Sequence, residues 1–298
     1  MKESFVTIHQ EEFASHPLFS RLLELHDIPK QLHIKGNLPE ITIDEYGRLS
    51  PRILTIVGSR KNTAYGKAVL KSLVASLPQD EVIIISGLAY GIDSIAHKAS
   101  LTNNITTIAI PGSGLSKSVL YPKAHYNLAE EIVEAGGCLI SEFPEDTVAT
   151  PWTFPARNRI MAALCDALLV IEAEEKSGTL ITARLALELG KDIGAVPGDV
   201  LSSYAKGTNK LIRDGAYSIL ESEDLYSLLH LSKKEEEKVA IELTEDEQLL
   251  LSLLAQPLPK DRLLSLSQMP LQTFLITISS LEMKKVVEET FGEVRRIV

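Results

Sequence analysis

Short apolar runs rich in Ile, Val and Leu alternate with longer helical stretches through the middle of this 298-residue chain. Buried parallel strands appear in sequences as continuous apolar runs, and a helix between two runs supplies the crossover that parallel pairing needs. The pattern therefore predicts an α/β domain with a mostly parallel sheet and helices on both faces. The predicted strands are 53–57, 82–85, 106–110, 138–140, 167–171 and 193–196.

Four of these strands are followed by small or turn-forming residues. Glycine has no side chain, so its backbone N–H can approach a bound ligand closely. Because parallel strands end at the same edge of a sheet, we expect a glycine-lined rim there. The four segments are Gly58-Ser59-Arg60, Ser86-Gly87, Pro111-Gly112-Ser113-Gly114 and Pro197-Gly198.

Basic residues and a small-residue helix start are predicted at this same rim. One arginine directly follows the first strand, two more precede strand 167–171, and a Ser-Gly-Thr turn after that strand opens a helix predicted over 180–189. A guanidinium binds phosphate through two parallel hydrogen bonds, and the first N–H groups of a helix attract anions. The sequence therefore predicts phosphate binding by Arg60, Ser113, Gly114, Arg157, Asn158, Arg159, Ser177, Gly178 and Thr179.

Familiar nucleotide-cofactor and catalytic motifs are missing from the sequence. The turn at Gly58 matches neither GxGxxG nor GxxxxGK[ST], and no acidic residue ends the second strand. Asp93, His97 and Glu172 are the acid or base candidates near strand ends, but no triad, metal-ligand or paired-carboxylate pattern assigns them to catalysis. We therefore predict no cofactor, no metal site and no catalytic residue.

The formal net charge of −10 does not by itself exclude a nucleic-acid ligand, because the charge is unevenly distributed. Residues 221–247 carry ten acidic and three basic residues, whereas residues 51–220 carry 17 and 16. The predicted α/β domain is therefore close to neutral and can concentrate cations at one edge. No apolar run is long enough for a membrane span and no export signal is evident, so we expect a cytoplasmic protein. Cys138 and Cys165 are expected to be buried thiols.

Four segments are predicted along the chain. Residues 1–50 form a short N-terminal lead-in, 51–229 the α/β domain, 230–243 an acidic linker and 244–298 a small domain. The small domain is expected to have three helices and a β-hairpin, which is typical of a winged helix. Its presumed recognition helix, 271–285, has Lys284 and Lys285 as its only basic residues, so contact with a protein remains as open as contact with DNA.

Eight motifs in order across residues 50–220 resemble the DNA-processing protein A family, also called DprA or Smf. They are Gly58-Ser-Arg60, Ser86-Gly-Leu-Ala-Tyr-Gly-Ile-Asp93, Tyr121-Pro-Lys123, Phe154-Pro-Ala-Arg-Asn-Arg-Ile160, Glu172-Ala173, Ser177-Gly-Thr-Leu-Ile-Thr-Ala183, Pro197-Gly198 and Asn209-Lys-Leu-Ile-Arg-Asp-Gly-Ala216. The resemblance implies an extended Rossmann-like domain with a C-terminal winged-helix-like domain. It also implies a non-enzymatic dimer that binds single-stranded DNA and delivers it to the RecA recombinase during natural transformation.

The family's DNA contacts would map here onto a basic pocket with small residues around it. The basic residues would be Arg60, Lys123, Arg157 and Arg159, and the small ones Ser59, Gly112, Ser113, Gly178 and Thr179. The alternative is a nucleotide-binding or nucleotide-hydrolysing enzyme of the lysine-decarboxylase-like Rossmann group, which has PGGxGTxxE. Thr182 stands where that motif has its glutamate, and a threonine cannot act as an acid or base. Binding is therefore favoured over catalysis.

Overall fold

The computed structural model describes residues 5–232, 243–254, 256–284, 286–290 and 292–296. The chain divides into two compact units, Met1–Lys233 and Lys234–Val298. Most of the predicted acidic linker, including the charged run at 233–238, lies outside the described residues. Residues 5–50 belong to the first unit together with the predicted α/β domain.

A nine-stranded, mostly parallel sheet forms the centre of the first unit, in the order β1-β2-β8-β7-β6-β5-β9-β10-β11. The strands from β8 to β11 in this order all pair in parallel with their neighbours. Strand β2 pairs antiparallel with both β8 and β1. Each of the six predicted strands is present, which confirms the α/β class. The strands are β1 (Val6–His9), β2 (Gln31–Gly36), β5 (Arg52–Val57), β6 (Val82–Ser86), β7 (Thr107–Ala109), β8 (Cys138–Ser141), β9 (Ala167–Val170), β10 (Asp192–Ala195) and β11 (Tyr217–Ser218). A separate hairpin joins β3 (Thr42–Ile43) and β4 (Leu49–Ser50).

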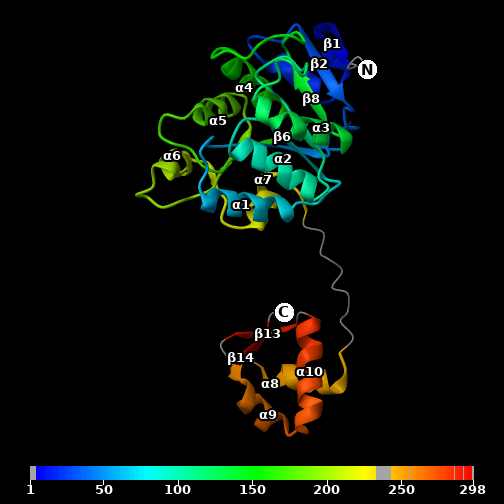
Figure 1. Ribbon diagram of the computed structural model, residues 1–298, viewed down its shortest axis with the longest axis vertical. Coiled ribbons are helices and arrows are strands. Elements are labelled where there is room, and N and C mark those ends of the chain that lie inside the picture. The colour runs from blue at the N-terminus through cyan, green and yellow to red at the C-terminus, as the bar shows by residue number, and fades with distance from the viewer. Residues whose placement is uncertain (1–4, 233–242, 255, 285, 291, 297–298) are drawn as a thin grey trace. The chain divides into compact units, whose positions relative to one another are not determined.

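Helices cover both faces of this sheet, as the sequence predicts (Figure 1). Alternate residues of β5 explain why: Leu54 and Ile56 enter the core beneath α1, α2 and α7, and Ile53 and Val57 enter the core beneath α4 and α5. No helix in the described residues is both long and apolar enough to cross a bilayer. The helices are η1 (Gln10–Ser15), η2 (Phe19–Glu24), α1 (Ala64–Ala75), α2 (Ile92–Thr102), η3 (Lys123–His125), α3 (Tyr126–Glu134), α4 (Thr153–Leu164), α5 (Gly178–Glu188), η4 (Ser203–Ala205), α6 (Lys206–Arg213) and α7 (Ser222–Leu228).

The N-terminal segment is an integral part of this unit and contributes both core and charge. The Asp166 carboxylate, at the start of β9, pairs with Arg21 of η2 at 2.7 Å and with Arg52 of β5 at 2.9 Å. It also accepts a hydrogen bond of 2.6 Å from the Ile53 backbone. One buried carboxylate therefore links the lead-in to two central strands.

The connections of the sheet create the place where a ligand can bind. From β5 the chain passes through α1, β6, α2, β7 and α3 to β8, and then α4 returns it to β9 on the other side of β5. The strand order therefore reverses between β5 and β9. In open α/β sheets, ligands bind in the crevice at the carboxyl ends of such a pair of strands.

Both cysteines are buried and unpaired, as predicted. Cys138 lies in β8 and Cys165 ends α4, and each is surrounded by the core of the sheet. Burial raises the pKa of both thiols to about 12. They therefore behave as small apolar residues at neutral pH.

The second unit contains the three helices and the hairpin that the sequence predicts. Its sheet has the order β12-β14-β13, and its core includes Leu250, Leu263 and Phe274. That this unit is a winged helix stays a prediction. Its elements are α8 (Glu245–Leu253), β12 (Leu258–Pro259), α9 (Lys260–Ser267), α10 (Leu271–Met283), β13 (Val287–Thr290) and β14 (Glu293–Arg296).

Glu247 links α8 to α10 in this unit. A capping box begins α8, since the Glu247 backbone N–H donates to the Thr244 hydroxyl and its carboxylate accepts from the Thr244 backbone N–H. The carboxylate also accepts hydrogen bonds of 2.7 Å from Ser280 and Lys284. Burial alone would raise the pKa of Glu247, but these donors outweigh it and lower the pKa from 4.5 to about 2.

We predict that Glu247 stabilises the second unit in a pH-dependent way. Because its pKa is lowered by folding, the stabilisation is complete above about pH 5.5 and is lost as the pH falls from 4.5 towards 2. Glu247→Gln should cost on the order of 2 kcal/mol at pH 7 and weaken the acid dependence. Hydrogen exchange of the α10 amides, corrected for the intrinsic rate at each pH, measures both effects. Glu245→Gln, in the same turn but exposed, is the control and should change neither.

Candidate functional site

A pocket of about 490 Å³ opens where β5 ends and where α4 and α5 begin. We call it the switch-point pocket, because it lies at the reversal of strand order between β5 and β9. Seven of the predicted site residues line it, together with Lys61, Asp93, Phe154 and other residues. The seven are Ser59, Arg60, Arg157, Asn158, Ser177, Gly178 and Thr179.

Arg60 is the exposed cation of the switch-point pocket. Its guanidinium carbon lies 4.9 Å from the centre of the Phe154 ring, so the aromatic face supports the cation from one side. Lys61 follows it and is also exposed, and its backbone N–H donates to the Ser59 hydroxyl at 3.1 Å. Among the described residues, neither Arg60 nor Lys61 has a carboxylate partner at ion-pair distance. Both cations are therefore available to an anionic ligand.

Arg157, by contrast, is buried, with 4% of its surface exposed. Its Nη1 donates to the carbonyl of Gly87 at 2.5 Å and to that of Ile110, which follow β6 and β7. Its Nε donates to the Asn158 side chain at 3.1 Å. Burial lowers the pKa of Arg157 to about 10, so the group remains charged at neutral pH. Most of its hydrogen-bonding capacity is therefore used to fix the floor of the pocket.

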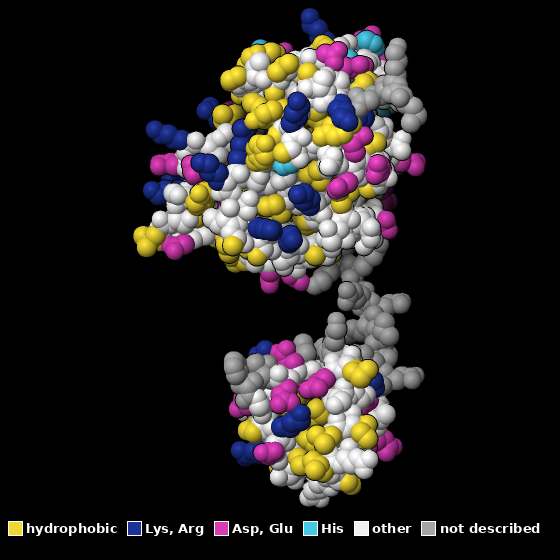
Figure 2. Space-filling model, in the orientation of Figure 1, with side chains coloured by type: hydrophobic (Ala, Val, Ile, Leu, Met, Phe, Trp, Pro, Cys, Tyr) yellow, Lys and Arg dark blue, Asp and Glu magenta, His cyan; other side chains and the backbone are white. Residues whose placement is uncertain are grey.

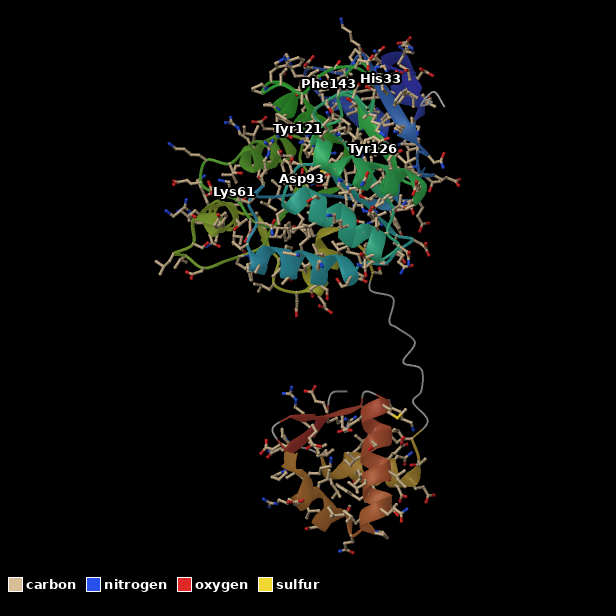
Figure 3. The ribbon with its side chains drawn as sticks, viewed as in Figure 1. His33, Lys61, Asp93, Tyr121, Tyr126 and Phe143 are labelled. Atoms are coloured by element: carbon tan, nitrogen blue, oxygen red, sulfur yellow. The ribbon has the colours of Figure 1, made fainter. Side chains whose placement is uncertain are left out.

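Asp93, at the start of α2, supplies the charge that balances Arg157 (Figure 3). It is 6% exposed and accepts hydrogen bonds from the backbone N–H groups of Ala89 and Gly87. Burial raises the pKa of Asp93, whereas Arg157 and these hydrogen bonds lower it. A side chain at Gly87 would overlap both the Arg157 guanidinium and the Asp93 carboxylate, so glycine is needed here to leave room for these two groups and not for approach to a ligand.

The start of α5 forms another wall of the pocket. The Ser177 hydroxyl accepts a hydrogen bond of 3.1 Å from the Thr179 backbone N–H, so Ser177 caps the helix that the Ser-Gly-Thr turn opens. The Thr179 hydroxyl donates to the Gly58 carbonyl at 3.1 Å and so ties the helix to the loop after β5. The first turn of α5 is the positive end of its helix dipole, which favours an anion at this end.

Three predicted small residues support the pocket from behind and do not line it. Ser113 is fully buried, and its hydroxyl accepts from the Tyr121 backbone N–H at 3.1 Å. Gly112 is in contact with Phe154, because a Cβ atom there would lie 2.6 Å from the ring. Gly114 donates its backbone N–H to the Thr147 carbonyl at 2.8 Å. Gly112 and Ser113 thereby hold Phe154 and Tyr121 in place, and we call these two rings the aromatic wall of the pocket.

Two predicted basic residues, Arg159 and Lys123, do not line the pocket either. Arg159 forms ion pairs with Glu142 and, at 3.6 Å, with Asp27, so its charge is already neutralised. Lys123 is exposed in η3, next to Tyr121, whose ring centre lies 5.7 Å from that of Phe154. Lys123 can therefore reach a ligand that extends past the aromatic wall, whereas Arg159 would first have to break its pairs.

Lys61 and Asp93 line the pocket but are absent from the set of predicted binding residues. In the sequence, the position of Lys61 directly after Arg60 could have identified it as a binding residue.

The residues weighed for catalysis are placed unfavourably for it. Thr182 lines the pocket and is 1% exposed, so a threonine occupies the place where the enzyme alternative requires a glutamate. His97 is fully buried, its Nδ1 lies 2.8 Å from the Thr107 hydroxyl, and burial lowers its pKa to about 3.

Figure 2 shows Lys and Arg side chains on the side of the first unit that carries α5 and α6. Several cations of these helices pair with neighbouring carboxylates, including Arg184 with Glu188 and Lys210 with Asp214. Arg60 and Lys61 at the pocket have no such carboxylate partner among the described residues. The fold and the site together define an α/β protein with a pocket at the switch point of its sheet, lined by two exposed cations and a helix N-terminus.

The chain belongs to the family of DNA recombination-mediator protein A, whose model matches residues 4–230. It is 38% identical over 205 residues to Protein Smf of Escherichia coli, across 69% of this chain and 52% of that protein. It is 36% identical over 223 residues to DNA processing protein DprA of Streptococcus pneumoniae, across 72% and 75%. The chain thus spans about half the length of the E. coli relative.

Solved structures agree with this assignment. The crystal structure of DprA from S. pneumoniae has a TM-score of 0.65 at 35% identity, covering 76% of this chain and 74% of that one. DNA processing protein A from Helicobacter pylori has a TM-score of 0.63 at 28% identity, covering 77% and 97%. The H. pylori structure was described for its single-stranded DNA binding mode. The predicted family and Rossmann-like fold are therefore confirmed.

We predict that Arg157 is needed for folding, whereas Arg60 is not. Arg157→Ala would leave the Asp93 carboxylate buried without its cation and should lower the free energy of unfolding by about 3–5 kcal/mol. Urea unfolding followed by the fluorescence of Trp152, the single tryptophan, reports on this unit. Arg60→Ala is the control and should change stability by less than about 0.5 kcal/mol.

A double variant, Arg157→Ala with Asp93→Asn, should recover part of the lost stability, because it removes the unbalanced charge. Equal stability of the Arg157→Ala and Arg60→Ala variants would contradict the structural role of Arg157.

Proposed function

We propose that this protein binds single-stranded DNA through the switch-point pocket. The observation that carries the proposal is the pair of exposed cations, Arg60 and Lys61, which have no carboxylate partner among the described residues and line a pocket with the start of α5. Phosphates of a single strand supply the negative charge that such a group attracts. Family membership and the single-strand binding of the H. pylori relative support the same ligand.

In this proposal the bases contribute less than the phosphates. Phe154 and Tyr121 form a short aromatic wall on which a base can stack, and stacking is tolerant of sequence. Arg60 lies over Phe154, so a phosphate bound to the guanidinium would place a neighbouring base near this wall. Sequence preference should therefore be slight, and the bases should remain accessible.

We further propose that a cytoplasmic homodimer passes the bound strand to the RecA recombinase, as in natural transformation. Membership in a family of recombination mediators supports this role. We propose a binding protein and not an enzyme, because Asp93 in the pocket is engaged with Arg157 and backbone N–H groups, and Thr182 cannot act as an acid or base. No observation favours the nucleotide-hydrolysing alternative.

Binding to a labelled single-stranded oligonucleotide, measured by fluorescence anisotropy across a salt series, tests the central proposal. Arg60→Ala should weaken binding about tenfold or more and make the salt slope shallower by about 0.7 log units, because one phosphate contact is lost. Arg184→Ala removes an exposed arginine of α5 that does not line the pocket, and should leave affinity almost unchanged. Equal binding by wild type and Arg60→Ala, or a preference for duplex DNA, would contradict the proposal.

Transfer to the recombinase and dimer formation require separate measurements. The rate at which RecA filaments form on single strands should rise when this protein is added, and Arg60→Ala should remove the effect. Sedimentation at several protein concentrations should give the mass of two chains. An unchanged filament rate with normal DNA binding would restrict the function to strand binding.

A further inference from the structure

A second pocket, of about 470 Å³, opens on the other side of the loop that follows β5. Its walls come from the start of α1, from the ends of β9 and β10, and from the loop before α6. We call it the Tyr65 pocket, after the half-exposed tyrosine whose hydroxyl donates to the Pro197 carbonyl at 2.8 Å. None of the predicted phosphate-binding residues lines it.

The chemistry of the Tyr65 pocket differs from that of the switch-point pocket. Ile171, Val196 and Pro197 give it an apolar lining, and two tyrosines, Tyr65 and Tyr204, add aromatic surface. Its only charged lining residues in the described chain are Glu172 and Asp199, so a phosphate would be repelled. An apolar pocket with a few polar groups suits a flat, uncharged ligand.

Glu172 sets which polar groups such a ligand should carry. It is 4% exposed, and its carboxylate accepts from the Thr63 hydroxyl and, at 2.9 Å, from the Thr63 backbone N–H. The two oxygens of a carboxylate together have about four acceptor positions, and these bonds use two of them. A ligand with N–H donors, such as a nucleobase with an exocyclic amino group, can use the remaining sites.

The two pockets share a narrow ridge. Lys61 lines the switch-point pocket and Thr63 lines the Tyr65 pocket, with Asn62 as the only residue between them. Two residues span at most about 7 Å even when fully extended. That distance corresponds to about two nucleotides of a stacked strand. A strand whose phosphates bind at Arg60 can therefore bring a nearby base over the ridge.

We infer that the Tyr65 pocket receives one nucleobase of the single strand whose phosphates bind in the switch-point pocket. The inference rests on the proposed function and extends it, because it assigns phosphate and base to two separate pockets. Adenine, cytosine and guanine, which carry amino groups, fit the Glu172 acceptor better than thymine does. Base insertion would hold the strand against sliding without demanding one particular sequence.

The test compares deoxyadenosine and abasic oligonucleotides of equal length and equal phosphate charge. Ser202 is half-buried, lines the Tyr65 pocket and has no side-chain cap bond, so Ser202→Trp should fill the pocket with little other change. We expect this variant to bind the deoxyadenosine strand about tenfold more weakly and the abasic strand as well as wild type does. Ser203→Trp, the same change at the adjacent exposed position, is the matched control and should affect neither strand.

A second variant keeps the test decisive if Ser202→Trp folds poorly. Tyr65→Ala removes the half-exposed ring and one hydrogen bond, and should cause the same selective loss. The inference is overturned if wild type binds the two strands equally, or if both variants bind as wild type does. It is also overturned if they lose both strands to the same extent. Failure of wild type to bind either strand would instead overturn the proposed function.

Discussion

The loop from Gly58 to Thr63 is held from both sides, and both pockets depend on this restraint. On one side the Thr179 hydroxyl of α5 donates to the Gly58 carbonyl, and on the other the hydroxyl and backbone N–H of Thr63 donate to Glu172 after β9. The loop follows β5, where the strand order of the sheet reverses. A restrained loop keeps Arg60 and Lys61 at the surface without carboxylate partners, so little ordering is left to occur when a ligand binds.

Burial divides the cations of the first unit into two groups with different tasks. Arg52, Arg157 and Arg159 are largely buried, and each is close to a carboxylate that offsets the cost of removing its charge from water. Arg60 and Lys61 are exposed, and their charge is not offset in this way. An acidic chain can therefore still attract a polyanion, because the potential at the pocket depends on these local cations and not on the sum of −10.

Of the described strands that pair in parallel, all but β11 could be predicted, because burial on both faces makes each of them a continuous apolar run, whereas β11 consists of an exposed tyrosine and a half-buried serine. Strand β1 has no such signal, since its residues are exposed or half-buried and it pairs at the edge of the sheet. Arg157 and Arg159 show the limit at the site. Residues two apart on a helix point in different directions, so one arginine reaches the pocket and the other turns to Glu142. The sequence places both on α4, but the register of α4 against the sheet comes only from packing.

The separation of charge between the two pockets bears on how a strand could be released as well as bound. The proposed phosphate contacts at Arg60 and Lys61 would weaken with salt, whereas the proposed apolar contacts in the Tyr65 pocket would not depend on counterion release. If a partner protein displaced the phosphates first, the strand would remain bound through its base. If the partner paired with or stacked on the bases first, the strand would remain bound through its phosphates. Either competitor can displace the strand in steps, and stepwise displacement avoids breaking all contacts at once. In the proposed function, the phosphates and one base would lie on opposite sides of the ridge between Lys61 and Thr63, and this separation is what a stepwise transfer to another protein would require.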